Sequence, residues 1–451
     1  MTQEREKKGV VNWFREVDWS VAYRTEDWVA VWIGLFLLAL CIFHLLPFVQ
    51  LPQAWGGEVG PVSETWPTYG ILGLLGTIVF VYIINAVGLY FQNEEIKKYS
   101  VGYIGVILLA MLAYFIGSHD YLAHYGFNEV IWALVLGLIV SNFFTKLAPA
   151  GGAIRYAART EQYIKTGLVL LGARIMFDQL LLLGAYGLGI AWTVTPIVII
   201  FMFWFALRVL KMYEDKEFAI TVASATSVCG VSAAIAAGTA AKAKKEHISV
   251  AIGVTLIFTV IMMVVMPAAI AAGGMNVHVG AAWIGGTIDS TGAVVAAGAM
   301  LGEEAMEIAA VIKMIQNVMI GLLAFLVAVF WVLVYERGQR DTSELHSAPL
   351  EIWIRLPKFV LGFVFASLVF TFLLAGEYRE HALDLANNWR GLFFVLAFVS
   401  IGLESNFKEM ARVLEGGKPL ILYVVGQSLN LLLTLIAAYI LFSGYFLPPV
   451  Y

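Results

Sequence analysis

Long apolar runs dominate the sequence, and their lengths match the thickness of a membrane. Crossing about 30 Å of hydrocarbon takes roughly 20 helical residues, and thirteen runs approach that length. They cover residues 28–48, 69–91, 101–117, 130–143, 166–183, 189–207, 218–241, 248–272, 279–300, 305–334, 356–374, 391–403 and 419–442. Only 13% of the residues are charged, about half the share of a soluble domain. The sequence therefore predicts an all-α polytopic membrane protein.

Composition and the amino terminus narrow the class of protein further. A net charge of −4 argues against nucleic acid as a partner, because nucleic-acid-binding surfaces are basic. Cys41 and Cys229 both fall within apolar runs, so neither a disulfide framework nor a metal site is predicted, and no cofactor is expected. Residues 1–27 are charged and contain no cleavable signal peptide. They are predicted to form a cytoplasmic arm, either solvated or with an interfacial helix over 11–28.

The distribution of lysine and arginine predicts a multi-pass orientation in the cytoplasmic membrane, since cytoplasmic loops are enriched in basic residues. With a cytoplasmic N-terminus and an external C-terminus, most basic residues fall at inner ends. Lys242, Lys244 and Lys245 are exceptions if every run spans the bilayer. They move to the inner side if 218–241 and 279–300 are re-entrant hairpins. Charge alone does not separate these two topologies.

Two of the apolar runs are interrupted by glycine and hydroxyl residues. The interrupting residues are Thr226, Ser227, Cys229, Gly230 and Ser232 in run 218–241, and Gly286, Thr287, Asp289, Ser290, Thr291 and Gly292 in run 279–300. Unwound backbone at membrane depth is tolerated only where it lines a cavity or is buried in protein. In secondary transporters, such breaks place half-helix N-termini, which favour anions, at the substrate site. Close helix packing is the alternative for any single small residue. We predict that the two breaks meet near mid-membrane and line one cavity.

Polar side chains in run 305–334 extend the candidate site. A charge in hydrocarbon is costly and normally faces a partner or a cavity, so Lys313 and Asp289 are candidate functional residues. The alternative is that they only pair with each other. Gln316 lies three residues after Lys313 on the same helical face, and Asn317 follows it. Lys313 would attract an anion, whereas Asp289 would bind Na⁺ or a proton.

Two other classes of function stay open. A passive anion channel would use the same polar breaks, but broken helices in inverted repeats favour alternating access. An intramembrane enzyme would need Cys229 as nucleophile and His247, beyond the same run, as base. No spacing in the sequence is typical of a catalytic triad, so no catalytic residues are assigned.

A weak internal repeat supports the transporter interpretation. Gly172 to Phe177 and Gly402 to Phe407 share the pattern G-x-x-x-x-F, and each precedes another apolar run in the opposite orientation. Inverted repeats require such opposite orientations. The predicted division is three additional segments within 28–129, followed by a core over 130–443 with five-segment repeats at 130–272 and 279–442. If the two breaks are instead equivalent positions of the two repeats, the segments correspond in a rearranged order, and this requires the hairpin topology.

Three stretches resemble the YeiH-type family of proposed sulfate exporters, and the likeness covers roughly 130–442. They are Ser227-Val228-Cys229-Gly230-Val231-Ser232-Ala233, the segment 286–298, and Ala309-Ala310-Val311-Ile312-Lys313. The resemblance implies the inverted-repeat, broken-helix fold of the bile acid symporter and cation/proton antiporter superfamily. It also implies a secondary transporter for a small inorganic or organic anion such as sulfate, sulfite or a sulfonate, coupled to H⁺ or Na⁺. A homo-oligomer is compatible with the sequence.

The sequence departs from that family's pattern at the candidate site. Asp289 and Ser290 stand where the family has a His-Glu pair, and Gln316 stands where it has an arginine. One cationic and one titratable group are thereby replaced. The departure makes an oxyanion less secure as substrate and favours a cation- or proton-linked role for Asp289.

Overall fold

The computed structural model describes residues 21–49, 51, 54–57, 60, 70–124, 127–335, 353–409 and 417–448. Residues 1–20 of the predicted N-terminal arm lie outside these ranges, and its residues 21–27 contain the helix Val21–Arg24 and the start of the next helix. Within them the named elements are all helices, and two isolated β-bridges join Trp55 to His119 and Gly56 to Gly60. The predicted all-α membrane class is confirmed, because seven helices, α5, α6, α11, α14, α17, α20 and α22, are long and apolar enough to cross a membrane.

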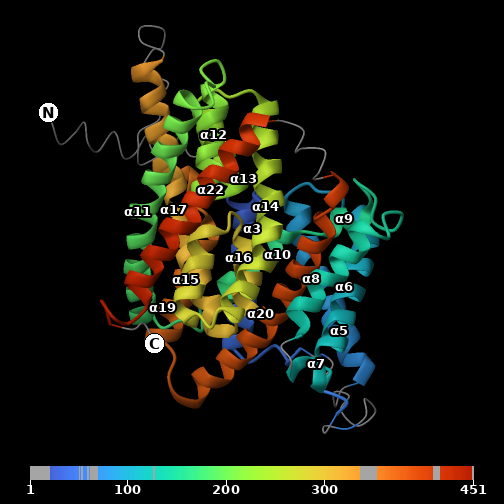
Figure 1. Ribbon diagram of the computed structural model, residues 1–451. Coiled ribbons are helices and arrows are strands. Elements are labelled where there is room, and N and C mark those ends of the chain that lie inside the picture. The colour runs from blue at the N-terminus through green and yellow to red at the C-terminus, as the bar shows by residue number, and fades with distance from the viewer. Residues whose placement is uncertain are drawn as a thin grey trace, which may run out of the picture.

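The helices are labelled in chain order in Figure 1. Their bounds are α2 Val21–Arg24, α3 Glu26–Ile42, α5 Gly70–Phe91, α6 Ile96–Gly117, α7 Asp120–His124, α8 Glu129–Asn142, α9 Ala153–Ala157, α10 Thr160–Leu171, α11 Phe177–Arg208, α12 Lys216–Ser227, α13 Gly230–Ala240, α14 Lys245–Ala272, α15 Val277–Thr287, α16 Thr291–Ala299, α17 Glu303–Val334, α19 Lys358–Phe372, α20 Gly376–Glu404 and α22 Gly417–Phe442.

The structure changes two of the predicted segment boundaries. Run 166–183 is not one segment, because α10 ends at Leu171 and α11 begins at Phe177. Helix α11 then continues through 184–188, the residues between predicted runs 166–183 and 189–207. Glycine there serves packing instead, since a Cβ on Gly187 would lie 2.8 Å from Cδ1 of Ile315. Run 391–403 is the apolar second half of the longer helix α20.

The first interrupted run is a re-entrant hairpin. Helices α12 and α13 are antiparallel, because Ile220 near the start of α12 packs in one cluster with Ala237 and Ala241 near the end of α13. The ring of His247, just after the hairpin, stacks on Phe218 at 4.5 Å between centroids. Both ends of the hairpin therefore lie on the same side of the molecule, which explains the three exceptional lysines.

The second interrupted run is also a hairpin, and it enters from the opposite end of the molecule. His278 at the start of α15 lies 2.6 Å from the Glu304 carboxylate, just beyond α16. The end of α16 also meets α17, since a Cβ on Gly298 would lie 2.8 Å from Cα of Met306. Run 279–300 therefore returns to the side from which it started.

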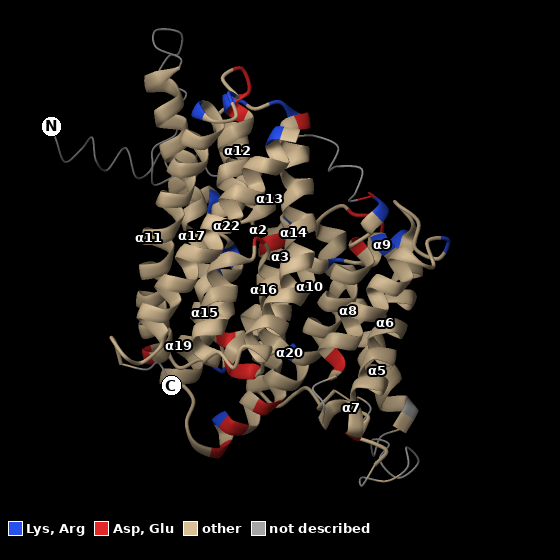
Figure 2. Cartoon of the chain, in the orientation of Figure 1, with Lys and Arg blue, Asp and Glu red and all other residues tan. Residues whose placement is uncertain are grey.

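By their packing contacts the helices form two bundles that meet at an interface. The scaffold bundle consists of α3, α5, α6, α8, α9, α10, α19 and α20, and the hairpin bundle of α11, α12 to α17 and α22. Across the interface, α16 packs on α10 and α20, and α11 packs on α19. Figure 2 shows lysine and arginine gathered at the end where α12 begins, with acidic residues prominent at the other end.

Candidate functional site

The tips of the two hairpins touch each other. The backbone N–H of Gly230, the first residue of α13, donates a hydrogen bond of 2.8 Å to the carbonyl oxygen of Asp289 in the break of the second hairpin. Gly230 leaves room for this approach, because a Cβ there would lie 2.7 Å from Oγ1 of Thr255. The breaks therefore meet inside the protein, as the sequence predicts.

The carboxyl ends of the half-helices are closed by side chains from α17 and α22. Nζ of Lys313 donates to the carbonyl of Val228 at 2.6 Å, and Nε2 of Gln316 donates to the carbonyl of Ser227 at 2.9 Å. Gln427 likewise donates to the carbonyl of Thr287 at 3.0 Å. These donors satisfy carbonyls that a helix end leaves without intrahelical partners. A lysine ammonium also suits the negative end of the helix dipole.

The amino ends of the other two half-helices are open. Neither Cys229, the N-cap of α13, nor Ser290, the N-cap of α16, caps its helix with a side chain. The first N–H groups of a helix have no intrahelical acceptor. The N–H of Gly230 bonds the Asp289 carbonyl, and the other N–H groups at both starts remain as hydrogen-bond donors. Cys229, Gly230, Ser232, Ser290 and Thr291 line one cavity of about 270 Å³. The positive ends of two helix dipoles thus converge on one space, which favours a negative charge there.

The cavity lies between the two bundles and reaches toward one end of the molecule. Its scaffold side is lined by Asp27, Glu161 and Lys165, at the starts of α3 and α10, and by Pro357 and Phe359 at the start of α19. Nζ of Lys165 lies 2.6 Å from Asp27 and 3.2 Å from Glu161. The mouth is therefore charged, whereas the inner end is built from the hairpin tips.

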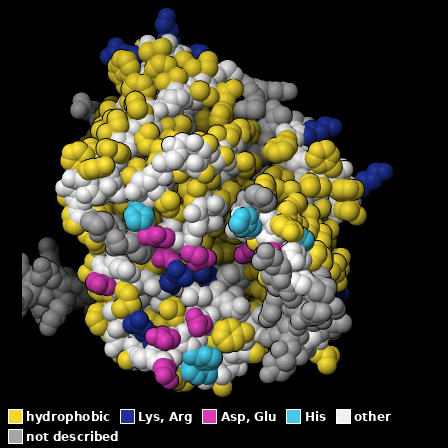
Figure 3. Space-filling view, turned by 60° about the horizontal axis from the view of Figure 1, so that its bottom comes forward, with side chains coloured by type: hydrophobic (Ala, Val, Ile, Leu, Met, Phe, Trp, Pro, Cys, Tyr) yellow, Lys and Arg dark blue, Asp and Glu magenta, His cyan; other side chains and the backbone are white. Residues whose placement is uncertain are grey.

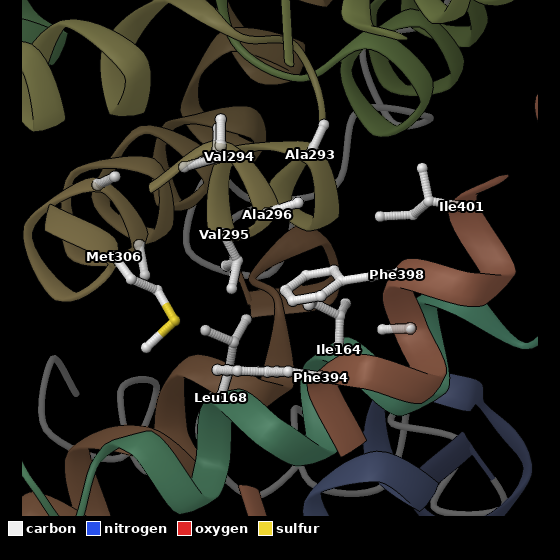
Figure 4. Close-up of a cluster of buried hydrophobic side chains, with 14 of the residues drawn as sticks. Ile164, Leu168, Ala293, Val294, Val295, Ala296, Met306, Phe394, Phe398 and Ile401 are labelled. Carbon is white, nitrogen blue, oxygen red and sulfur yellow. The ribbon is translucent and has the colours of Figure 1, made fainter. Parts of the chain in front are cut away.

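On the opposite side, the space beyond α16 is filled. Figure 4 shows Val295 and Ala296 of α16 on the side of Ile164 and Leu168 of α10 and of Phe394 and Phe398 of α20. These side chains belong to the main hydrophobic core. An apolar layer thus closes the interface between the bundles on the side away from the mouth.

Ion pairs join the two bundles beyond that apolar layer. Arg390 of the scaffold bundle lies 2.7 Å from Glu303 at the start of α17, and Arg174, which follows α10, contacts Glu307. Figure 3 shows basic and acidic side chains side by side on this face of the molecule. Opening this side would require the pairs to separate.

Asp289 is buried between the hairpin tip and α22. Its Oδ2 accepts a hydrogen bond of 2.5 Å from the hydroxyl of Tyr423, and the residue is 2% exposed. Among the described residues Asp289 and Lys313 do not form an ion pair, because the Lys313 ammonium is held by Val228 and by Oε1 of Gln316, at 2.6 Å each. The simple structural pair considered from the sequence is therefore not the arrangement found.

The structure brings the sequence-predicted residues to one place, but in two roles. The cavity is lined by Cys229, Gly230, Ser232, Asp289, Ser290, Thr291 and Asn317. Behind it lie Thr226, Ser227, Gly286, Thr287, Gly292, Lys313 and Gln316, which form the hairpin stems or hold them. Sequence reasoning missed Tyr423, Thr255 and Thr259. Thr255 and Thr259 are hydroxyl residues within the apolar run 248–272, and this polarity was the feature of the sequence that could have indicated them.

The pairing of Cys229 with His247 in an enzyme is wrong on geometry. Cys229 lies at the tip of the first hairpin, and His247 lies beyond its base, with the 11 residues of α13 between them. A helix of that length spans about 16 Å, far beyond hydrogen-bond reach. Within the described residues, no group of three or more His, Cys, Asp or Glu side chains is placed to hold a metal ion.

Comparisons with known proteins identify relatives over most of the chain. Residues 101–423 match the family model described as conserved hypothetical protein 698. A UPF0324 membrane protein of Rhodopirellula baltica is 46% identical over 411 residues, 89% of this chain and 73% of that protein. A UPF0324 membrane protein of Nitratidesulfovibrio vulgaris is 48% identical over 81% of this chain, which spans 63% of that relative's length. The UPF0324 membrane protein TauZ of Paracoccus denitrificans is 31% identical over 71% of this chain and 90% of its own length. No solved structure matches the chain.

Proposed function

The chain belongs to the UPF0324 family of membrane proteins, and from this premise we propose that it is a secondary transporter for a small anion. The observation that carries the proposal is the convergence of two uncapped helix N-termini on one cavity. Backbone N–H groups and helix dipoles bind anions without a dedicated basic side chain. The sulfate, sulfite or sulfonate class rests on the family resemblance, and a cavity of about 270 Å³ suits a solute of that size.

Alternating access is the proposed mechanism. The site lies between two bundles, it is reached from one side, and an apolar layer with ion pairs closes the other side. Movement of the hairpin bundle against the scaffold bundle would close the mouth at Lys165 and separate Arg390 from Glu303. This arrangement favours a transporter over a passive channel, because a channel needs a continuous path.

The packing also supports inverted repeats with a permuted order. Helix α11 packs on α12 as α22 packs on α15, and α14 contacts the first hairpin as α17 contacts the second. A Cβ on Gly172 would meet the Phe363 carbonyl of α19 at 2.2 Å, and one on Gly402 would meet the Leu134 carbonyl of α8 at 2.5 Å. We therefore pair α8, α10, α11, the first hairpin and α14 with α19, α20, α22, the second hairpin and α17. Repeats 130–272 and 279–442 keep their limits, but their segments correspond in this permuted order.

Ligand-dependent thermal stabilisation tests the proposed function. Sulfate, sulfite, alkyl sulfonates, carboxylates and bicarbonate are compared on purified protein, with and without Na⁺ and at two pH values. A ligand at a hundredfold excess over its Kd stabilises the folded state by about 2.7 kcal/mol, so at least one oxyanion is expected to raise the unfolding temperature. The same anion should be taken up into proteoliposomes. Stabilisation by none of the panel would contradict an oxyanion site.

We place the mouth of the cavity on the cytoplasmic side, because basic residues gather at that end. A cysteine at exposed Lys244, between α13 and α14, is then expected to react with a membrane-impermeant maleimide only after permeabilisation of cells. A cysteine at exposed Ala272, the end of α14, should react in intact cells. The unsubstituted chain is the control, because it shows how much the maleimide labels the native Cys41 and Cys229. The reverse pattern would overturn the orientation.

A further inference from the structure

Three buried oxygen atoms around the cavity lack a protein partner. They are Oδ1 of Asp289, Oδ1 of Asn317 and Oγ1 of Thr259. All three residues line the cavity, and they are 2%, 3% and 4% exposed. Buried polar atoms are normally hydrogen-bonded, and leaving one unsatisfied costs about 1 to 3 kcal/mol. Three such acceptors around one cavity therefore indicate a ligand that attracts oxygen atoms.

The orientation of Thr259 strengthens this point. Threonine in a helix commonly donates to the carbonyl one turn back, as Thr255 does toward Ala251 and Ile252 at 3.1 and 2.8 Å. Thr259, one turn further along α14, makes no such bond in the structure. Its oxygen is left available at the cavity instead.

We propose that Asp289, Asn317 and Thr259 form a binding site for one monovalent hard cation, Na⁺. A carboxylate, an amide carbonyl and a hydroxyl are oxygen donors of the kind that hard cations take. A single carboxylate balances one positive charge, whereas Ca²⁺ and Mg²⁺ sites draw on several carboxylates or on phosphate. A proton would satisfy Asp289 alone and would not use all three oxygens.

This site deepens the proposed function and rests on it for its role, because it lies next to the anion site. The amide of Asn317 donates through Nδ2 to Oγ1 of Thr291, the first residue of α16, at 2.9 Å. A cation on Oδ1 of Asn317 fixes the orientation of that amide and thereby of the start of α16. It also neutralises the Asp289 carboxylate, which would otherwise repel an anion. Cation binding therefore favours anion binding, and linkage makes the effect reciprocal.

The test compares NaCl with choline chloride and KCl at equal chloride concentration, at fixed pH and without added oxyanion. Na⁺ is expected to raise the unfolding temperature of the unsubstituted protein by roughly 3 °C at a hundredfold excess over its Kd. Thr259→Val removes one oxygen at nearly constant volume and should weaken Na⁺ binding about tenfold, the effect of one lost ligand worth about 1.4 kcal/mol. Asp289→Asn should abolish the shift.

Thr221→Val is the matched control. Thr221 is equally buried, but it lies in α12 away from the cavity, and its hydroxyl bonds the Glu217 carbonyl. This variant should keep the full Na⁺ response. Equal stabilisation by Na⁺ and choline, or an unchanged Na⁺ response in Thr259→Val, would overturn the site. Stabilisation that follows acidification in choline and ignores Na⁺ would replace the cation with a proton.

Anion binding is measured separately, by titrating sulfate in choline chloride and again in NaCl. A Na⁺ shift that Thr259→Val weakens, together with no response to any oxyanion, would retain the cation site and reject the proposed anion function. Sulfate stabilisation without any Na⁺ response would retain the proposed anion function and reject the cation site. Tighter sulfate binding in NaCl than in choline chloride is the expected result.

Discussion

Gly230→Val is expected to abolish anion binding in a protein that still folds. A Cβ at this position would lie 2.7 Å from Oγ1 and 3.0 Å from Cβ of Thr255, so the start of α13 must move away from α14. The movement breaks the contact of the Gly230 N–H with the Asp289 carbonyl and misaligns both helix N-termini. Hydrogen bonds to a charged group contribute about 1.5 to 3 kcal/mol each. Loss of two of them lowers affinity by at least about 100-fold.

Folding and binding are separated by the choice of variants. Overpacking costs about 1 to 3 kcal/mol, so Gly230→Val should lower the unfolding temperature without preventing purification. Gly184→Val is the matched control, because the nearest atom to a Cβ there is Cδ1 of Ile315 at 3.8 Å. Gly184→Val should keep sulfate stabilisation and uptake. A folded Gly230→Val protein with unchanged sulfate stabilisation would remove the N-terminus of α13 from the site.

The site could be predicted from the sequence to the extent that its residues interrupt apolar runs. Glycine and hydroxyl residues around Gly230 and Asp289 stand out against Leu, Ile and Val because each is costly in lipid. That signal gave both breaks and their meeting point. The same residues do not show whether each run crosses the membrane or turns back, since a re-entrant hairpin and a spanning helix of equal length have the same composition. The hairpins follow from packing between α12 and α13 and at the ends of α15 and α16.

Other parts of the site carry no signal of their own. Thr259 and Tyr423 lie in long apolar helices where threonine and tyrosine are ordinary residues. They enter the site only because α14 and α22 pack against the hairpin tips. The extent of α11 was hidden for a related reason. Glycines at 184 and 187 are typical of a loop in a sequence, but within a bundle they allow close approach of helices.

Lys313→Met is expected to have the largest effect on stability, and its effect should differ in kind from that of Asp289→Asn. The Lys313 ammonium bonds the Val228 carbonyl and Oε1 of Gln316, and the residue is 1% exposed. Its removal frees both acceptors and leaves Asp289 without its nearby positive charge. Hydrogen bonds to a charged group contribute about 1.5 to 3 kcal/mol each, so losing both costs about 3 to 6 kcal/mol. Asp289→Asn costs less, because an asparagine oxygen can still accept from Tyr423.

The double variant separates electrostatics from the capping of α12. Asp289→Asn in the Lys313→Met background removes the uncompensated carboxylate, so part of the free energy of unfolding should return. The Val228 carbonyl stays without its donor, so recovery should be incomplete. Lys358→Met is the matched control for loss of a buried lysine, since Lys358 also donates to a carbonyl, that of Leu356, at 2.8 Å. It should lower stability, and adding Asp289→Asn to it should restore none of the loss.

Transport decides whether these two charges are functional. If Asp289 and Lys313 served only to stabilise the fold, a double variant that folds would also transport. We expect instead that Asp289→Asn/Lys313→Met reconstitutes into proteoliposomes but takes up no anion above empty vesicles. The reason is geometric: Lys313 fixes the end of α12 immediately before the tip that carries Cys229 and Gly230, and Asp289 lies in the other tip. Full uptake by the double variant would show that the helix N-termini need neither charge, and would leave the backbone N–H groups alone as the anion site.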